Sequence, residues 1–187
     1  PLRWPVATPD ADFDVLAQIG GSAVTVTSLL DDPNADPHAF ESSPQNAASV
    51  ADARLVIVNG VGYDAFMQRL LASGGTADRT VINVQDLLGT ADDANPHVWY
   101  DPATMARVAD AATAALSRLD PADSASFDAN EQAYLAACQP IVDKIAALKA
   151  RYAGAPIAFT EDVAGYLTDQ IGLAVRSPAG FMKSVEE

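Results

Sequence analysis

The sequence contains very little cysteine, histidine and positive charge. Its 187 residues include one cysteine, Cys138, and two histidines, His38 and His97. A single cysteine excludes an intrachain disulfide and a zinc site built from several cysteines. Lysine and arginine number 11 against 25 aspartates and glutamates, so the formal net charge is −14. Because phosphate groups are bound by basic surfaces, we expect neither nucleic acid nor an anionic membrane surface as a partner.

The signatures of common enzyme classes are also missing. There is no nucleophile-elbow serine and no P-loop, and Gly60-Val61-Gly62 lacks the third glycine of a dinucleotide-binding motif. Without a metal, the two histidines offer no evident general base. No apolar run approaches the roughly 18 residues of a membrane span. The chain starts at Pro1 without methionine, so the sequence does not test for a leader peptide.

The residues that are present indicate a folded α/β protein. Hydrophobic residues make up 49% and charged residues 19%, which argues against disorder. Segments with strand-like and helix-like patterns alternate, and this alternation predicts parallel sheet flanked by helices. Residues 1–8 are too short to assign, and residues 177–187 are expected to form a loop. The expected strands are 23–30, 55–59, 80–84, 156–160 and 173–175, and the expected shorter helices are 10–19, 44–53, 64–72, 102–119 and 163–170.

The longest predicted element is a helix after Asp120-Pro121, a pair that resembles a helix cap followed by a proline at the first helical position. Its apolar side chains recur at helical spacing over about seven turns. Pro140 lies inside it and is expected to produce a kink. The residues on the predicted apolar face are Phe127, Tyr134, Cys138, Ile141, Ile145, Leu148 and Tyr152.

This helix divides the chain into three parts. We expect an N-terminal α/β lobe over residues 1–119, a linking helix over 120–153 and the start of a C-terminal α/β lobe over 154–187. The last part is expected to be an incomplete lobe, because about 35 residues with two candidate strands cannot close a sheet layer.

Each histidine directly follows a proline, in Asp36-Pro37-His38 and in Asn95-Pro96-His97. Proline disfavours helix for the residue before it, so both histidines are expected in loops. Both loops follow predicted strands, and the carboxyl ends of parallel strands are where ligands bind in open α/β sheets. Neutral imidazole is a common ligand of zinc and other transition metals. The two loops could therefore converge on one divalent metal, or the histidines could be ordinary surface residues near turns.

Glu161 is the third candidate ligand, because it directly follows the strand predicted at 156–160. Its carboxylate would complete a set of two histidines and one carboxylate. The alternative is an acid at a helix N-terminus stabilised by the macrodipole, and Asp162 fits that alternative better. Asp101 and Asp120 are adequately explained as helix caps.

Three further side chains could support such a site. Glu41 lies close to His38 in the sequence and could orient its loop. Trp99 and Tyr100 could form a wall of the site, although packing in the core or between lobes explains either residue better.

Several segments of the chain resemble the metal-binding proteins of bacterial zinc and manganese ABC importers. They cover nearly the whole chain, and the two proline-histidine motifs at this separation make the resemblance specific. The segments are DPHAFESSP (36–44), ADARLVIVNGVGYD (51–64), NPHVWYDP (95–102), LDPADSASFDANEQAYLAAC (119–138) and FTEDVAGYLTDQIGL (159–173).

The resemblance implies two α/β lobes joined by one long rigid helix, with the metal held between the lobes. It implies that His38 and His97 are the ligands from the first lobe. The family's third ligand follows the first strand of the second lobe, where this chain has Glu161, with Tyr166 five residues later. The fourth family ligand, an aspartate late in the second lobe, has no counterpart before Glu187.

The function implied is that of a periplasmic or otherwise extracytoplasmic solute-binding protein, with a lipid anchor as an open option. It would capture Zn²⁺ or Mn²⁺ as a monomer and deliver the ion to an ABC permease without chemical change, so it would not be an enzyme. Oxygen ligands suit manganese, whereas zinc binds more tightly in the general affinity order, and both metals stay open. The alternatives are a metal-dependent hydrolase with the same ligands, or a related adhesin or siderophore-binding protein.

Overall fold

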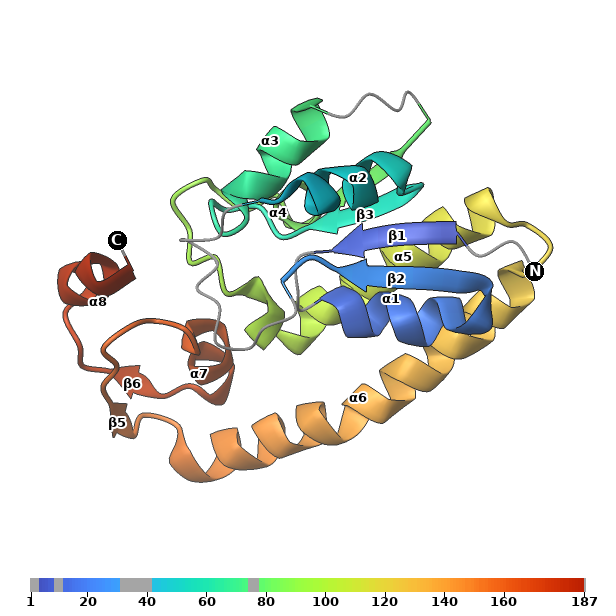
Figure 1. Cartoon of the computed structure of the whole chain (residues 1–187). Helices are drawn as coiled ribbons and strands as arrows, with labels where there is room; N and C mark the ends of the chain where they lie inside the picture. The colour runs from blue at the N-terminus through green and yellow to red at the C-terminus, as the bar shows by residue number, and fades with distance from the viewer. Residues whose placement is uncertain (1–3, 9–11, 31–41, 74–77, 187) are drawn as a thin grey trace.

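The computed structural model describes residues 4–8, 12–30, 42–73 and 78–186. Two parallel sheets of unequal size are flanked by helices, and the long helix α6 (Ser124–Tyr152) runs from the part of the chain around the larger sheet to the part around the smaller one (Figure 1). We call the four-stranded sheet with its helices the first lobe. The second lobe consists of β5 (Pro156–Ile157), α7 (Gly165–Ile171), β6 (Ala174–Val175) and α8 (Ala179–Glu186). The α/β fold predicted from the sequence, with two lobes and one long helix, is confirmed.

The first lobe is organised around a parallel sheet in the order β2-β1-β3-β4. The continuous apolar sequence of β3 places this strand inside the sheet, with β1 on one side and β4 on the other. The strands predicted at 23–30, 55–59 and 80–84 are confirmed with shorter bounds, and β1 occupies part of the unassigned start of the chain. The strands are β1 (Trp4–Thr8), β2 (Val24–Ser28), β3 (Leu55–Val58) and β4 (Thr80–Asn83).

Helices cover both faces of this sheet, as the alternating side chains of β3 show. Leu55 and Ile57 belong to a core cluster with α1, α5 and the first half of α6. Val56 and Val58 belong to a second cluster with α2 and α3. Successive strand residues face opposite sides, so a fully apolar strand needs a hydrophobic layer on each side. The helices are α1 (Asp12–Gly20), α2 (Pro44–Asp52), α3 (Ala65–Ser73), α4 (Val84–Leu88) and α5 (Pro102–Leu119).

Local capping chemistry explains where two of these helices begin. Ser43 Oγ accepts a hydrogen bond from Asn46 N at 3.2 Å, and Asp101 Oδ1 accepts one from Ala103 N at 2.9 Å. In both cases a proline follows at the first helical position. The prediction that Asp120 caps the long helix is wrong. Helix α6 begins four residues later, and Asp120 Oδ1 instead accepts from Ala122 N at 3.2 Å within the connecting turn.

Helix α6 (Ser124–Tyr152) is continuous through Pro140. Its predicted apolar face is only partly buried. Phe127 and Tyr134 pack into the first lobe and Ile145 is buried further along, but Ile141 is 55% exposed. The first part of α6 contacts α1 and α5 and the later part contacts α7. The helix therefore changes partners along its length, and the stretch between them faces solvent. The kink expected at Pro140 stays a prediction.

The second lobe is short. Its two strands are β5 (Pro156–Ile157) and β6 (Ala174–Val175), which pair in parallel, so the strand predicted at 156–160 is shorter than expected. Helix α7 (Gly165–Ile171) lies between them in sequence. The prediction of a loop over 177–187 is wrong, because α8 (Ala179–Glu186) forms there after Pro178. Eight residues are too few for a clear helical period. Within the described part of the chain, no helix is both long and apolar enough to cross a bilayer.

Candidate metal centre

His97 lies in the loop that connects α4 to α5, directly before a single helical turn, η2 (Val98–Tyr100). The sequence predicted a loop soon after the strand at 80–84, but the short helix α4, which was not predicted, lies between β4 and this loop. The residue is only 5% exposed. Burial of an imidazole is costly unless its nitrogens have partners, so the surroundings of this ring decide what it can do.

Glu161 faces His97 from the second lobe. His97 Nε2 and Glu161 Oε1 are 3.9 Å apart, although the two residues are far apart in the sequence. That separation is too long for a hydrogen bond. It is about half an ångström more than the roughly 3.4 Å between two ligand atoms on a tetrahedral ion with bonds of about 2.1 Å. A small shift of either side chain would let both atoms bind one metal ion.

The alternative explanation of Glu161 as a helix N-terminal acid loses its basis. Helix α7 begins at Gly165, and its first turn contains no acidic residue. Glu161 therefore precedes the helix by four residues, where the field of a short helix is weak. Asp162 lies closer to this helix end, since its Oδ1 would be 2.6 Å from a Cβ placed on Gly165. His38, the remaining predicted ligand, lies outside the described residues, as does Glu41.

Asn95 holds the His97 ring. Asn95 Oδ1 accepts a hydrogen bond from His97 N at 2.9 Å and lies 2.8 Å from His97 Nδ1. A carbonyl oxygen can only accept, so the proton of a neutral ring belongs on Nδ1. This leaves Nε2, the nitrogen that faces Glu161, as the one with the lone pair. That is the tautomer an imidazole needs to bind a metal through Nε2.

The loop after β3 supports the His97 loop through a hydrogen bond. Asn59 Nδ2 donates to the carbonyl oxygen of Pro96 at 2.9 Å, directly before His97. Asn59 is itself fixed, because its backbone N–H donates to Asp64 Oδ2 at 2.7 Å while Gly60 N donates to Asp64 Oδ1 at 3.0 Å. Burial raises the pKa of Asp64 above its ordinary value of 3.8, and these backbone hydrogen bonds act in the opposite direction.

The same loop has an unusual backbone. Gly60, Val61 and Gly62 all have positive φ angles, of 76°, 53° and 77°. A positive φ is a real outlier for a β-branched residue such as Val61. At Gly60 two things exclude a side chain. The φ angle is positive, and a Cβ would lie 2.6 Å from Asn83 Oδ1. The structure keeps this strained conformation where the loop supports His97 and where Val61 borders the cleft described below.

Aromatic rings surround the imidazole. The centroid of the His97 ring is 5.3 Å from that of Trp99 and 6.1 Å from that of Tyr63, and both pairs meet edge to face. Tyr63 and Trp99 also contact each other at 4.8 Å. Trp99 therefore packs against the candidate ligand His97, and a role for Trp99 as a wall of the site stays a prediction. Tyr63, Asn59 and Asp64 were not predicted from the sequence as parts of the site. The available signal was the polar residues on either side of Gly60-Val61-Gly62, a stretch that had been compared only with a dinucleotide-binding motif.

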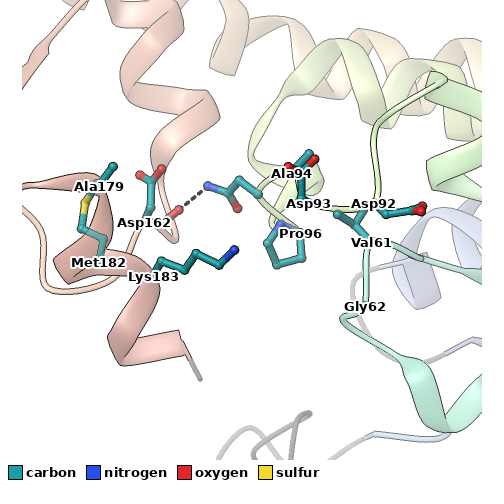
Figure 2. A pocket seen from close by; sticks show the side chains of 11 residues that line it. Val61, Gly62, Asp92, Asp93, Ala94, Pro96, Asp162, Ala179, Met182 and Lys183 are labelled. Atoms are coloured by element: carbon teal, nitrogen blue, oxygen red, sulfur yellow. Dashed lines mark hydrogen bonds between the residues drawn. The ribbon is translucent and has the colours of Figure 1, made fainter.

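A cleft of about 640 Å³ lies beside these residues, between the loop of Asn95 and the second lobe. Figure 2 shows Asp92 and Asp93 on the first-lobe side and Asp162 on the second-lobe side, with Lys183 extending from α8 toward Pro96. The dashed line marks the hydrogen bond from Asn95 Nδ2 to the carbonyl oxygen of Asp162. Three carboxylates against one ammonium make the cleft more favourable to cations than to anions.

The described residues alone do not form a complete metal site. Among them, no group of three or more histidine, cysteine, aspartate or glutamate side chains is arranged to hold a metal ion. A metal ion bound by His97 and Glu161 would therefore need further ligands from outside the described residues. The predicted set of His38, His97 and Glu161 stays a prediction.

Comparison with known proteins agrees with the resemblance found in the sequence. The model of the family "zinc-uptake complex component A periplasmic" (ZnuA) matches residues 6–187. The chain belongs to this family. Among its relatives, the manganese-binding lipoprotein MntA of Halalkalibacterium halodurans is 29% identical over 137 residues, which cover 71% of this chain and 45% of MntA.

A second relative is the high-affinity zinc uptake system protein ZnuA of Bacillus subtilis. It is 24% identical over 177 residues, covering 84% of this chain and 55% of that protein. The chain thus spans about half the length of these ZnuA-family relatives. The crystal structure of the metal-dependent lipoprotein YcdH of B. subtilis superposes with a TM-score of 0.83 at 21% identity, covering 94% of this chain and 66% of YcdH. At this identity the superposition shows the fold.

Proposed function

We propose that this chain is the metal-capturing part of an extracytoplasmic solute-binding protein that delivers Zn²⁺ or Mn²⁺ to an ABC permease. The observation that carries the proposal is the approach of His97 Nε2 to Glu161 Oε1, at 3.9 Å, from opposite lobes of a ZnuA-family chain. The relatives named for manganese binding and zinc uptake support the cargo class. A net charge of −14 favours the approach of cations over anions.

The proposed ligands are His38, His97 and Glu161. His97 is held by Asn95 in the tautomer that binds a metal through Nε2. Glu161 provides a carboxylate, and the combination of imidazole and carboxylate ligands suits both zinc and manganese. We assign neither metal over the other.

We also propose that the chain is divided into two lobes and a linking helix. Residues 1–119 would form the N-terminal lobe, 120–153 the linking helix and 154–187 the beginning of the C-terminal lobe. The run of α6 from the helices of the first lobe to α7 supports this division. The protein would act as a monomer in the periplasm or outside the cell membrane. It would release the ion unchanged and would not be an enzyme.

Isothermal titration calorimetry with ZnCl₂ and MnCl₂ at neutral pH tests the proposal. We expect the full chain to bind at least one of the two ions, and His97→Ala to weaken that binding by more than about tenfold, as loss of a ligand should. The exposed Asp128, on α6, provides a control for loss of charge, and Asp128→Asn should leave the affinity unchanged. Absence of binding by the unaltered chain, or equal affinity in the His97→Ala variant, would contradict the proposal. Hydrolysis of esters or phosphates by the metal-loaded protein would point to an enzyme instead.

A further inference from the structure

Three groups of Asn95 form hydrogen bonds: the side-chain oxygen, the side-chain nitrogen and the backbone carbonyl. Its side-chain oxygen bonds to His97 N and Nδ1, as described above. Its side-chain nitrogen donates to the carbonyl oxygen of Asp162 at 2.5 Å. Its backbone carbonyl accepts from Tyr166 Oη at 2.9 Å. Asp162 and Tyr166 both belong to the second lobe, so Asn95 connects the imidazole with the other lobe.

The partners fix the orientation of the amide. The backbone N–H of His97 can only donate, and the carbonyl of Asp162 can only accept. Rotating the amide by half a turn would set NH₂ against N–H and oxygen against oxygen, and both bonds would be lost. One planar group therefore carries the contact with the second lobe and the contact with the imidazole.

An ordinary turn of the kind common at Asx-Pro sequences explains only part of this arrangement. Such a turn accounts for the hydrogen bond that His97 N donates to Asn95 Oδ1, two residues earlier in the chain. It does not require a bond between Asn95 Nδ2 and the second lobe. Glu161 also directly precedes Asp162, so a displacement that breaks the Asn95 contact would move the facing carboxylate as well.

We propose that Asn95 is a positioning residue that makes the orientation of His97 depend on the placement of the second lobe. With the second lobe in place, the amide is held at both ends and directs Nδ1–H toward itself and Nε2 toward Glu161. When the second lobe moves away, the amide loses Asp162 and the imidazole loses its fixed acceptor while Glu161 withdraws. One movement thus weakens both ligands. This coupling rests on the proposed metal capture and would give the protein a way to release its cargo.

Three substitutions separate the parts of this role. Asn95→Asp keeps an oxygen acceptor for His97 but cannot donate to the carbonyl of Asp162. Asn95→Ala removes both functions. Tyr166→Phe removes a bond to the second lobe and leaves the amide in place. Thr168, whose hydroxyl bonds to Gly165 O within α7, provides a matched control, because Thr168→Val removes a hydroxyl that does not reach the first lobe.

The first measurement uses the metal-free chain and does not depend on metal binding. Two-bond ¹H–¹⁵N correlation spectra at about pH 8, above the usual histidine pKa of about 6.5, report the tautomer of each ring, and the chain has two histidines to assign. We expect His97 to carry its proton on Nδ1 in the unaltered chain and in Asn95→Asp. In Asn95→Ala we expect a mixture of tautomers. An unchanged spectrum in Asn95→Ala would overturn the proposed role.

The second measurement is the rate at which Zn²⁺ or Mn²⁺ leaves the protein in excess chelator, followed by stopped flow. We expect Asn95→Ala to accelerate release by about 10–100-fold, the usual effect of losing a residue that orients a metal-binding histidine. Asn95→Asp and Tyr166→Phe should accelerate release by smaller factors, and Thr168→Val should match the unaltered chain. Release from Asn95→Asp and Tyr166→Phe at the unaltered rate would overturn the coupling to the second lobe. If the unaltered chain binds neither ion, the proposed function fails, and the tautomer spectra still decide whether Asn95 orients His97.

Discussion

His97 and Glu161 are held in very different ways by their two lobes. The His97 ring is almost fully buried and is fixed by Asn95, by aromatic rings and by a loop that Asn59 supports. The side chain of Glu161 is 35% exposed, and within the described residues its carboxylate forms no hydrogen bond. The side chain of His97 is therefore fixed in place before any ion arrives, whereas the side chain of Glu161 can adjust. Only the Glu161 side chain needs to move for His97 Nε2 and Glu161 Oε1 to reach the spacing that a shared ion would require.

The hydrophobic cores of the two lobes show the same difference. The sheet of the first lobe has four strands with a packed cluster on each face. The second lobe has two strands of two residues each, and few of its apolar side chains are buried, among them Ile171 and Met182. Elements with few buried apolar contacts open at lower free energy than a central sheet. The second lobe is thus the part from which movement is expected.

The largest expected effect on stability comes from replacing one buried isoleucine by alanine in the core of each lobe. Ile57→Ala, in the centre of β3, should lower the unfolding free energy by about 2–5 kcal/mol, because it leaves a cavity in a fully packed sheet. Ile171→Ala, at the end of α7, should cost less than about 2 kcal/mol, because the smaller lobe relaxes around the change. Urea unfolding followed by circular dichroism measures both. Equal losses would contradict the difference between the lobes.

A smaller effect on the unfolding free energy is expected at Asp64, which fixes the loop that supports His97. Asp64→Asn keeps one acceptor but turns an NH₂ group toward a backbone N–H. We therefore expect a loss of about 1–3 kcal/mol at neutral pH, measured by urea unfolding. The change should also alter the dependence of stability on pH.

The sign of that pH dependence follows from the raised pKa of Asp64. The folded chain holds the Asp64 proton more tightly than the unfolded chain does, so protonation favours folding. This stabilising contribution is complete below pH 3.8 and is lost as the pH rises through the folded pKa. In Asp64→Asn, whose amide does not titrate, this decline in stability should be absent. Stability is measured in the unaltered chain and in Asp64→Asn from below pH 3.8 upward. A decline of equal size in the two proteins would show that Asp64 is not its source.

Local signals in the sequence were sufficient for much of the first lobe. The apolar run of β3 predicted an interior strand, and Ser43 and Asp101, each followed by proline, predicted two helix starts. The same signal misled at Asp120, because an aspartate before proline suits a turn as well as a cap. Helix α8 was missed because it is short, and the apolar pattern of α6 did not reveal that Ile141 faces solvent between two packing partners.

The candidate site depended less on local signals. The proline-histidine motifs predicted that His97 lies in a loop, and the structure places it there, but helix α4 separates this loop from β4. The approach of His97 to Glu161 is a contact between lobes. The position of Glu161 after a predicted strand made it a candidate ligand, and the family resemblance implied that the metal lies between the lobes. The roles of Asn59 and Tyr63 arise only when the loops after β3 and β4 come together. Such contacts have no periodicity or spacing in the sequence.

The most direct test of the account is the position of the ion itself. Crystals of the full chain grown with Zn²⁺ or Mn²⁺ can be measured at the X-ray absorption edge of each metal. We expect one anomalous peak between His97 Nε2 and the Glu161 carboxylate, at about 2.0–2.2 Å from each ligand atom. A peak on the acidic surface away from these two side chains, with none between them, would contradict the proposed site.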